Sequence, residues 1–296
     1  MKNALVRSLA LAGIVSCAGI DATQGEQQTL AHFQIAAERS LGATTNDIIL
    51  LEEFLSDAQS RIQKPRPQSH EYAVATLRKI DEMLKQHCFF PTKEGADLLS
   101  QALRTRKVDC DLYTSLYMSI AQRCSLPLVA VECPEHMFVR WKFPDGKYIN
   151  WETTQGLITE EEDYKKYLYR VGAPLGRHPA MPYIRFQEFS PDAYAAWIAV
   201  TRYDYCSHLL PRTQRPALKE EVHTLLIKYL SEQIEKKPFS LERMYLRGIA
   251  YETLGMQQEA ISDYRIARSY PLSIDFKKNA FRSMYAGKLW KKTGKK

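Results

Sequence analysis

The sequence lacks several features that would place it quickly in a class. Its 296 residues contain no internal apolar run long enough to cross a bilayer. They contain no recognised nucleic-acid-binding motif and no platform of arginines and aromatics. The net charge of +7 comes partly from a lysine-rich tail, so it does not indicate a basic binding face. These absences argue against an internal transmembrane segment and against a nucleic-acid partner.

The cysteines also lack the regular spacing of a disulfide framework or a zinc site. There are six in the chain: Cys17, Cys88, Cys110, Cys124, Cys133 and Cys206. The short separation of Cys133 and His136 would suit a pair of metal ligands, and His87 with Cys88 offers two more. No second pair with the first spacing exists, so we expect no metal and no cofactor.

The first 17 residues resemble a secretory leader. Two basic residues precede a short apolar run that ends in Ile14-Val15-Ser16-Cys17, which resembles the lipobox of bacterial lipoproteins. The expectation is a lipid anchor at Cys17, which would hold the protein in the cell envelope facing the periplasm or the exterior. Residues 18–44 would then be a polar tether and a first helix. The alternative is a cytoplasmic protein that begins with a short helix.

Apolar periodicity predicts three helices before residue 106. The first runs to about Ile62 with Thr45 or Asn46 as its cap, the second covers residues 68–87, and a short third covers residues 94–105. The second helix carries one apolar stripe at spacings of three and four, formed by Ala73, Leu77, Ile80 and Leu84. We therefore expect each of these helices to pack one apolar face against a common core.

The stretch from Val108 to Thr154 contains the residue types of a cysteine nucleophile site. Asp109 can cap a helix whose first turn carries Cys110 on its apolar face. The unpaired N–H groups and the dipole at a helix start favour a thiolate, the nucleophilic form. The flanking Asp109 and Asp111 oppose this by repulsion, so a nearby histidine cation would be needed.

Two strands follow, and the turn between them decides whether a carboxylate can reach His136. Alternation predicts strands at residues 128–131 and 136–143, and Pro144-Asp145-Gly146 predicts a three-residue hairpin turn. If Phe143 pairs with Lys147, Glu152 faces Phe138 and becomes a diagonal neighbour of His136 on one sheet face. A four-residue turn would place Glu152 on the opposite face.

The C-terminal part reads as helical from Ser190 onward, with Pro191 in a first helical turn. Residues 155–190 are either a wall of the site or a plain surface loop. Positions close to those of a tetratricopeptide repeat follow: Gly248, Tyr251, Ala260, Tyr264, Ala267 and Pro271. One repeat must pack on neighbours, for which residues 218–234 and 276–289 are candidates. Residues 191–296 are therefore predicted as an all-α, repeat-like domain able to bind a protein partner.

The order of these motifs resembles a known family. Cys110, then LYMSIAQRCSLPLVAV, then PEHMFVR and finally INWETT is similar to bacterial transglutaminase-like proteins, most of all the SirB-related group that often carries tetratricopeptide repeats. The resemblance implies an α+β fold over residues 45–190, with a papain-like nucleophile helix packed on an antiparallel sheet. It also implies that Cys110 is the nucleophile, His136 the general base and acid, and Glu152 the orienting carboxylate in place of the usual aspartate.

The implied function is a thiol hydrolase or an acyltransferase that acts on amide bonds of a peptide or protein substrate. Water as acceptor gives a hydrolase and an amine gives a transferase, and the sequence leaves both open. Asn150 and Trp151 are candidates for the substrate pocket, although Trp151 also suits a core position. The alternative function is a catalytically inactive papain-like module with repeat-like helices that binds a protein or peptide. No glutamine ahead of Cys110 is identifiable as an oxyanion donor, so the backbone N–H of Cys110 and a further side chain would have to supply it.

Overall fold

The structure is a computed structural model that describes residues 28–62, 69–87, 89–92, 96, 98–133, 136–164, 187–207, 210–236, 238 and 240–269. The predicted leader, its Cys17 and most of the tether lie outside these residues, as do Cys88, Pro271 and the predicted helix at residues 276–289. In the part of the chain that is described, we find no helix with the length and apolar character needed to cross a membrane.

The N-terminal helices are α2 (Leu30–Ala37), α3 (Thr45–Arg61) and α4 (His70–Gln86), with a short 3-10 turn at Arg39–Leu41 after α2. The start of α3 differs by one residue from the prediction. Thr44 is its cap, because the Asp47 carboxylate accepts hydrogen bonds from the Thr44 N–H (2.7 Å) and hydroxyl (3.0 Å). The predicted apolar stripe of α4 is confirmed, since all four of its residues are fully buried.

Between α4 and the helix that carries Cys110 the chain forms a small irregular region. Strands β1 (Phe90–Pro91) and β2 (Lys107–Val108) pair in parallel, and α5 (Leu99–Thr105) starts later than predicted. The start of α5 has no cap from Leu98, its own N-cap residue. Instead, the buried Glu38 carboxylate accepts from the N–H groups of Leu99 and Ser100, both at 2.8 Å. This long-range cap could not be read from local sequence.

Helix α6 (Cys110–Cys124) is the central helix of the fold. Its predicted cap is confirmed, because the Asp109 carboxylate accepts a 3.0 Å hydrogen bond from the Leu112 N–H. Residues 112–121 of this helix are all buried, since the sheet lies on one side of it and α2 and α3 lie on another. A helix packed on several sides has little freedom to shift, and it therefore fixes the place of its first residue.

The main sheet has the order β6-β5-β4-β3-β7 and is antiparallel throughout. Its strands are β3 (Leu128–Cys133), β4 (His136–Lys142), β5 (Tyr148–Glu152), β6 (Leu157–Ile158) and β7 (Gln187–Phe189). The predicted hairpin is confirmed: the Phe143 N–H donates to the Lys147 carbonyl at 2.9 Å, and Gly146 has the positive φ of 85° that the turn requires. This turn also sets the register between β4 and β5, in which Val139 pairs with Trp151.

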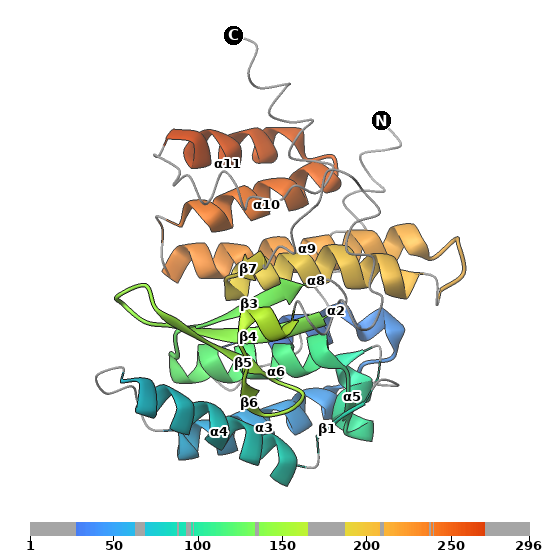
Figure 1. The fold of residues 1–296 in the computed structure, drawn as a ribbon. Coiled ribbons are helices and arrows are strands. Elements are labelled where there is room, and N and C mark those ends of the chain that lie inside the picture. The colour runs from blue at the N-terminus through green and yellow to red at the C-terminus, as the bar shows by residue number, and fades with distance from the viewer. Residues whose placement is uncertain are drawn as a thin grey trace, which may run out of the picture.

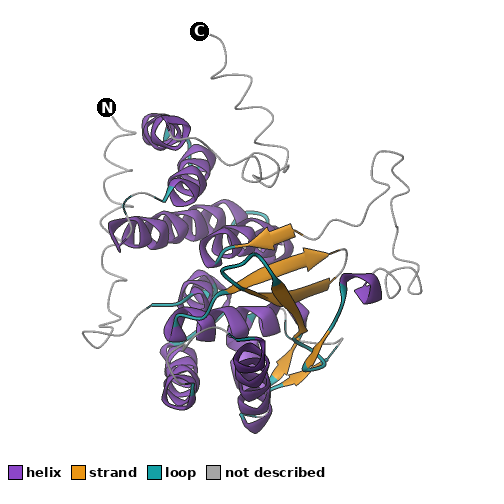
Figure 2. Ribbon diagram, turned by 60° about the vertical axis from the view of Figure 1, so that its left-hand side comes forward, coloured by secondary structure: helices purple, strands orange, loops and turns teal. Residues whose placement is uncertain are grey.

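The two faces of the sheet bury different sets of side chains. The face toward α6 carries the core residues Met137, Val139, Trp141, Ile149 and Trp151. The opposite face carries a smaller cluster of Val131, Cys133, Phe138 and Tyr164. Figure 2 shows the strands lying to one side of the helices. His136, Phe138 and Glu152 share the second face, as the alternation of the strands demands.

Four further helices stack beyond the edge of the sheet, as Figure 1 shows. They are α8 (Pro191–Ser207), α9 (Arg215–Lys236), α10 (Leu241–Thr253) and α11 (Gln257–Ser269). The predicted start of α8 is confirmed, since the Ser190 hydroxyl accepts from the Ala193 N–H at 3.1 Å. The predicted α+β core with a helical C-terminal segment is confirmed. Helix α2 touches both α8 and α9, so the N-terminal helix joins the two parts.

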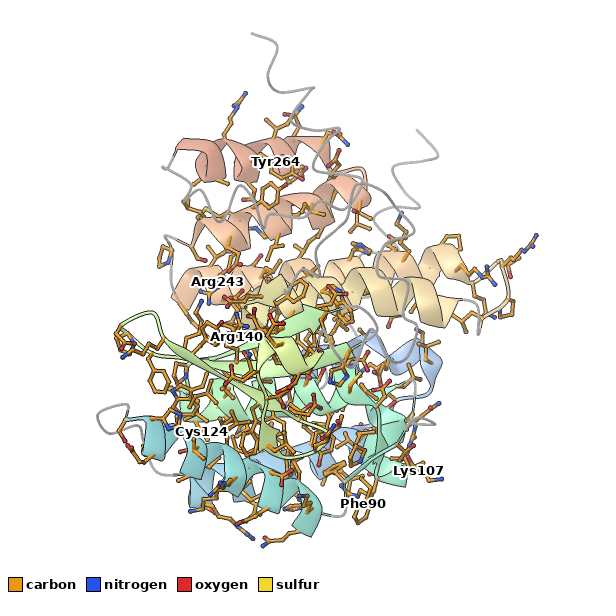
Figure 3. The ribbon with its side chains drawn as sticks, viewed as in Figure 1. Phe90, Lys107, Cys124, Arg140, Arg243 and Tyr264 are labelled. Atoms are coloured by element: carbon orange, nitrogen blue, oxygen red, sulfur yellow. The ribbon has the colours of Figure 1, made fainter. Side chains whose placement is uncertain are left out.

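Helices α10 and α11 form a closely packed antiparallel pair because Gly248 has no side chain. A Cβ added at Gly248 would lie 2.6 Å from the ring of Tyr264, which Figure 3 labels between the two helices. Arg247 and Asp263 tie the pair further through two hydrogen bonds of 2.7 and 2.8 Å. The small residue at position 248 therefore lets the two helices approach closely.

The first prediction concerns this contact. Replacing Gly248 with Ala should cost about 1–2 kcal/mol of unfolding free energy, because overpacking typically costs about 1–3 kcal/mol and the better helix propensity of alanine returns up to about 1. Urea unfolding measures it. The same change made in a Tyr264→Leu background should be neutral or stabilising, and an equal cost in both backgrounds would show that the ring contact is not the cause.

Candidate active site

Cys110 lies at the first position of α6 and is partly exposed, unlike residues 112–121 of the same helix. The N–H of Leu112 is already bound by the carboxylates of Asp109 and Asp111, at 3.0 and 2.9 Å. The N–H groups of a first helical turn have no partner within the helix. The Cys110 sulfur thus sits beside the positive end of the α6 dipole, which favours a negative charge there.

His136 is the first residue of β4 and holds two partners at once. Its Nε2 atom lies 2.6 Å from Oε2 of Glu152, and its imidazole also hydrogen-bonds the side chain of Cys110. With Nε2 engaged by the carboxylate, Nδ1 is the nitrogen available to the sulfur. The three residues that the sequence predicted as a site are therefore brought together as one hydrogen-bonded chain.

Both oxygens of the Glu152 carboxylate accept hydrogen bonds. Oε2 accepts from His136 and from the Tyr164 hydroxyl (2.9 Å), while Oε1 accepts from the Thr154 N–H (3.0 Å) and the Thr154 hydroxyl (2.5 Å). Burial acts to raise the pKa of this carboxyl, but the hydrogen bonds and charge of His136 and the donors of Thr154 outweigh it and lower the pKa. Glu152 is therefore a buried, fixed anion.

His136 carries a proton over a wide pH range, because Cys110 and Glu152 both stabilise its charged form. Burial lowers the pKa of the imidazole, but its hydrogen bonds to Cys110 and Glu152 and the charges of these two residues prevail and raise the pKa from 6.5 to about 9. An imidazolium is therefore the favoured form at neutral pH. This cation lies beside Cys110, where it can offset the repulsion that Asp109 and Asp111 exert on a negatively charged sulfur.

A second thiol lies next to the site. Cys133 pairs directly with His136 across β3 and β4 and is almost fully buried. Burial raises the pKa of the Cys133 thiol to about 12, with the charges of Glu152 and Cys110 adding to the effect. Cys133 is thus a neutral thiol. Among the described residues, no cluster of three or more histidine, cysteine or acidic side chains has the arrangement of a metal site.

The two residues predicted to bind substrate are both buried and have partners within the protein. Asn150 accepts a 2.7 Å hydrogen bond from Nε of Arg140, which Figure 3 labels on the sheet. Trp151 lies on the α6 face and donates from Nε1 to the Tyr117 hydroxyl at 3.0 Å. The structure thus gives both side chains a place in the fold, and their predicted role toward a substrate stays a prediction.

Sequence reasoning missed two tyrosines that touch the site. Tyr164 binds the carboxylate of Glu152, and Tyr194 of α8 donates to the carbonyl of Asp111, the residue after Cys110, at 2.8 Å. Tyr164 lies in the segment that was expected to be a wall or a surface loop, and Tyr194 lies in the helical part. Neither had a sequence signal, because no periodicity or motif relates these positions to Cys110 or Glu152.

The second prediction concerns the coupling of His136 to Cys110. In the full chain, the NMR titration midpoint of His136 should lie near 9, and it should fall by roughly one pH unit in Cys110→Ala, because a hydrogen bond and a neighbouring negative charge are lost. Cys124→Ala, at the far end of the same helix, is the control and should leave the midpoint unchanged. An unchanged midpoint in Cys110→Ala would contradict the pairing.

The chain can be compared with curated proteins, with solved structures and with family models. Among curated proteins, none matches the chain significantly. One similar solved structure is the crystal structure of menin described as revealing the binding site for Mixed Lineage Leukemia (MLL) protein, with 12% identity and a TM-score of 0.40 over 84% of this chain and 67% of menin. Similarity at that level supports no conclusion on fold or function.

The third comparison is with family models, and it matches the part of the chain that holds the site. Residues 48–183 match the model of the transglutaminase-like superfamily. Cys110, His136 and Glu152 all fall within this range, as do α6 and four strands of the main sheet. The part of the chain that holds the candidate site is thus similar to the transglutaminase-like superfamily.

Proposed function

We propose that the protein is a cysteine-dependent hydrolase or acyltransferase that acts on amide bonds of a peptide or protein through Cys110, His136 and Glu152. The observation that carries this proposal is the single hydrogen-bonded chain of thiol, imidazole and carboxylate. The superfamily covers both catalytic and inactive members, so the family alone does not give the activity. An intact chain of three groups in this order favours a catalytic member.

The proposed reaction follows the roles of the three side chains. The Cys110 sulfur adds to the amide carbonyl carbon, and His136 donates its proton to the nitrogen that leaves as an amine. A thioester on Cys110 remains. Neutral His136 then takes a proton from water or from a second amine, which attacks the thioester carbon. The bond to the Cys110 sulfur breaks, an acid or a new amide is released, and Cys110 returns as a thiolate beside protonated His136. Glu152 orients the ring and stabilises its charged form throughout.

The start of α6 would also stabilise the oxyanion that forms when the sulfur adds. The backbone N–H of Cys110 belongs to the first turn, and the helix dipole adds a positive potential at that point. The N–H of Leu112 cannot serve, because two carboxylates bind it. This arrangement would take the place of a glutamine donor, for which no residue ahead of Cys110 is identifiable.

We also propose a setting for this activity. The SirB-related resemblance and the α10 and α11 pair support a repeat-like helical segment that binds a protein partner. The leader with Cys17 supports a lipid-anchored protein of the cell envelope. A peptide of the envelope is then the first substrate class to test, and the hydrolase and the transferase are distinguished by whether an added amine enters the product.

The third prediction is selective alkylation. Iodoacetamide should modify Cys110 fastest among the thiols of the native protein, with a pH-dependent rate, because the helix start and the His136 cation favour the thiolate. Peptide mapping by mass spectrometry identifies the modified residue. The buried Cys124 and Cys133 serve as internal controls in the same sample.

The role of His136 is tested in the same assay. His136→Ala should slow the alkylation of Cys110 at neutral pH by about tenfold or more, since the cation beside the sulfur is lost. A Cys110 that reacts no faster in the native protein than in unfolded protein would contradict the catalytic proposal. It would favour the binding module instead.

The fourth prediction concerns the products. Incubation with envelope peptides should give cleaved or amine-linked products that disappear in Cys110→Ala and persist in Cys124→Ala, because only the first variant lacks the nucleophile. Mass spectrometry of the peptide mixture measures both kinds of product. If the wild type and Cys110→Ala gave identical mixtures with every peptide while both bound them, this residue would not catalyse the reaction.

A further inference from the structure

Tyr164 makes a contact that the three proposed catalytic residues do not require. Its hydroxyl donates to Oε2 of Glu152 at 2.9 Å, the same oxygen that lies 2.6 Å from Nε2 of His136. Burial raises the pKa of the Tyr164 phenol, and the negative charge of Glu152 adds to this effect. The phenol therefore keeps its proton and acts as a donor to the carboxylate.

The ring of Tyr164 is fixed as firmly as its hydroxyl. It is only 4% exposed and stacks on Phe138, with ring centroids 4.3 Å apart and planes inclined by 11°. Its centroid also lies 5.8 Å from that of His136. The ring thus packs beside the bond between His136 and Glu152 on the second face of the sheet, and it contributes to keeping that bond buried.

The segment that carries Tyr164 is tied down on the same face by an ion pair. Residues 161–164 form a single helical turn. At its start, Glu161 accepts from Arg140 at 2.6 Å and from the Tyr148 hydroxyl at 3.2 Å. Arg140 is itself buried and lies over the Tyr148 ring at 3.9 Å. This anchor leaves the turn little freedom to lift Tyr164 away from the carboxylate.

We propose that Tyr164 is a positioning residue of the site, which sets how strongly Glu152 binds His136 and keeps water away from this pair. The proposal rests on the proposed function only for its consequence in catalysis, since the contact itself exists whether or not Cys110 reacts. His136 and Tyr164 both donate to Oε2 of Glu152, so each hydrogen bond weakens the other. Tyr164 thereby limits the charge that Glu152 offers to the imidazole.

Four titratable groups surround this contact, and each comes from a different strand or helix. They are Glu152 of β5, His136 of β4, Cys133 of β3 and Cys110 of α6. Cys133 keeps its proton because burial raises its pKa to about 12. The pH response of the contact therefore comes chiefly from His136, whose pKa is raised to about 9.

The hydroxyl and the ring of Tyr164 should act on His136 in opposite directions. Tyr164→Phe removes one donor from Oε2, and the carboxylate stays in place through Thr154, so the titration midpoint of His136 should rise by roughly half a pH unit or more. Tyr164→Ala opens the pair to water, so the midpoint should fall toward 6.5, the ordinary pKa of histidine. NMR titration of the full chain measures both midpoints.

The matched control is Tyr264→Phe, which also removes a tyrosine hydroxyl that donates to a carboxylate. That hydroxyl binds Glu252 at 3.4 Å in the pair of α10 and α11, away from His136 and Glu152, so the midpoint should stay at the wild-type value. Urea unfolding of each variant separates folding from positioning, because a purely structural role would lower stability without moving the midpoint. A midpoint in Tyr164→Phe equal to that in Tyr264→Phe would overturn the proposal.

A second readout separates this inference from the proposed function. The pH profile of Cys110 alkylation should shift in Tyr164→Phe in the same direction as the His136 midpoint. If Cys110 of the wild type proved unreactive, the proposed function would fail, while the His136 titration would still test Tyr164. If Cys110 reacted but neither variant of Tyr164 moved the midpoint or the profile, only the positioning role would fail.

Discussion

The hydrogen bond between His136 and Glu152 depends on the length of one turn. Three residues, Pro144 to Gly146, lie between the hydrogen-bonded Phe143 and Lys147 at the end of the hairpin, and this length brings Glu152 to the same sheet face as His136. One more residue would send the carboxylate to the α6 face, where Trp151 now lies in the core. Gly146 has the positive φ that this turn requires. The turn at one end of the hairpin thus controls whether His136 and Glu152 meet at the other end.

The sulfur is positioned by a different part of the fold. Helix α6 is packed by the sheet, α2 and α3, and α8 adds Tyr194 at the Asp111 carbonyl. The C-terminal helices are therefore attached close to the first turn that carries Cys110, although they belong to a separate segment of sequence. Ser190 and Asp192 at the start of α8 bind Glu242 and Arg243 of α10, at 2.7 and 2.6 Å. Side-chain contacts thus connect the terminal helix pair to the nucleophile helix.

Local sequence predicted the site because its parts lie on neighbouring elements. The Asp109 cap, the alternation of β4 and the three-residue turn are short-range signals, and they place Cys110, His136 and Glu152. The cap of α5 by Glu38, strand β7 and the contacts of Tyr164 and Tyr194 could not be predicted. Each depends on packing between segments far apart in the chain, which leaves no periodic pattern in the sequence.

The most direct test of the account is whether Cys110, His136 and Glu152 act as one unit in the resting protein. The rate at which iodoacetamide alkylates Cys110 at neutral pH is compared in the wild type, His136→Ala and Glu152→Ala. The account predicts that both variants react more slowly than the wild type, because Glu152 stabilises the imidazolium that lies beside the sulfur. Equal rates in all three proteins would contradict it.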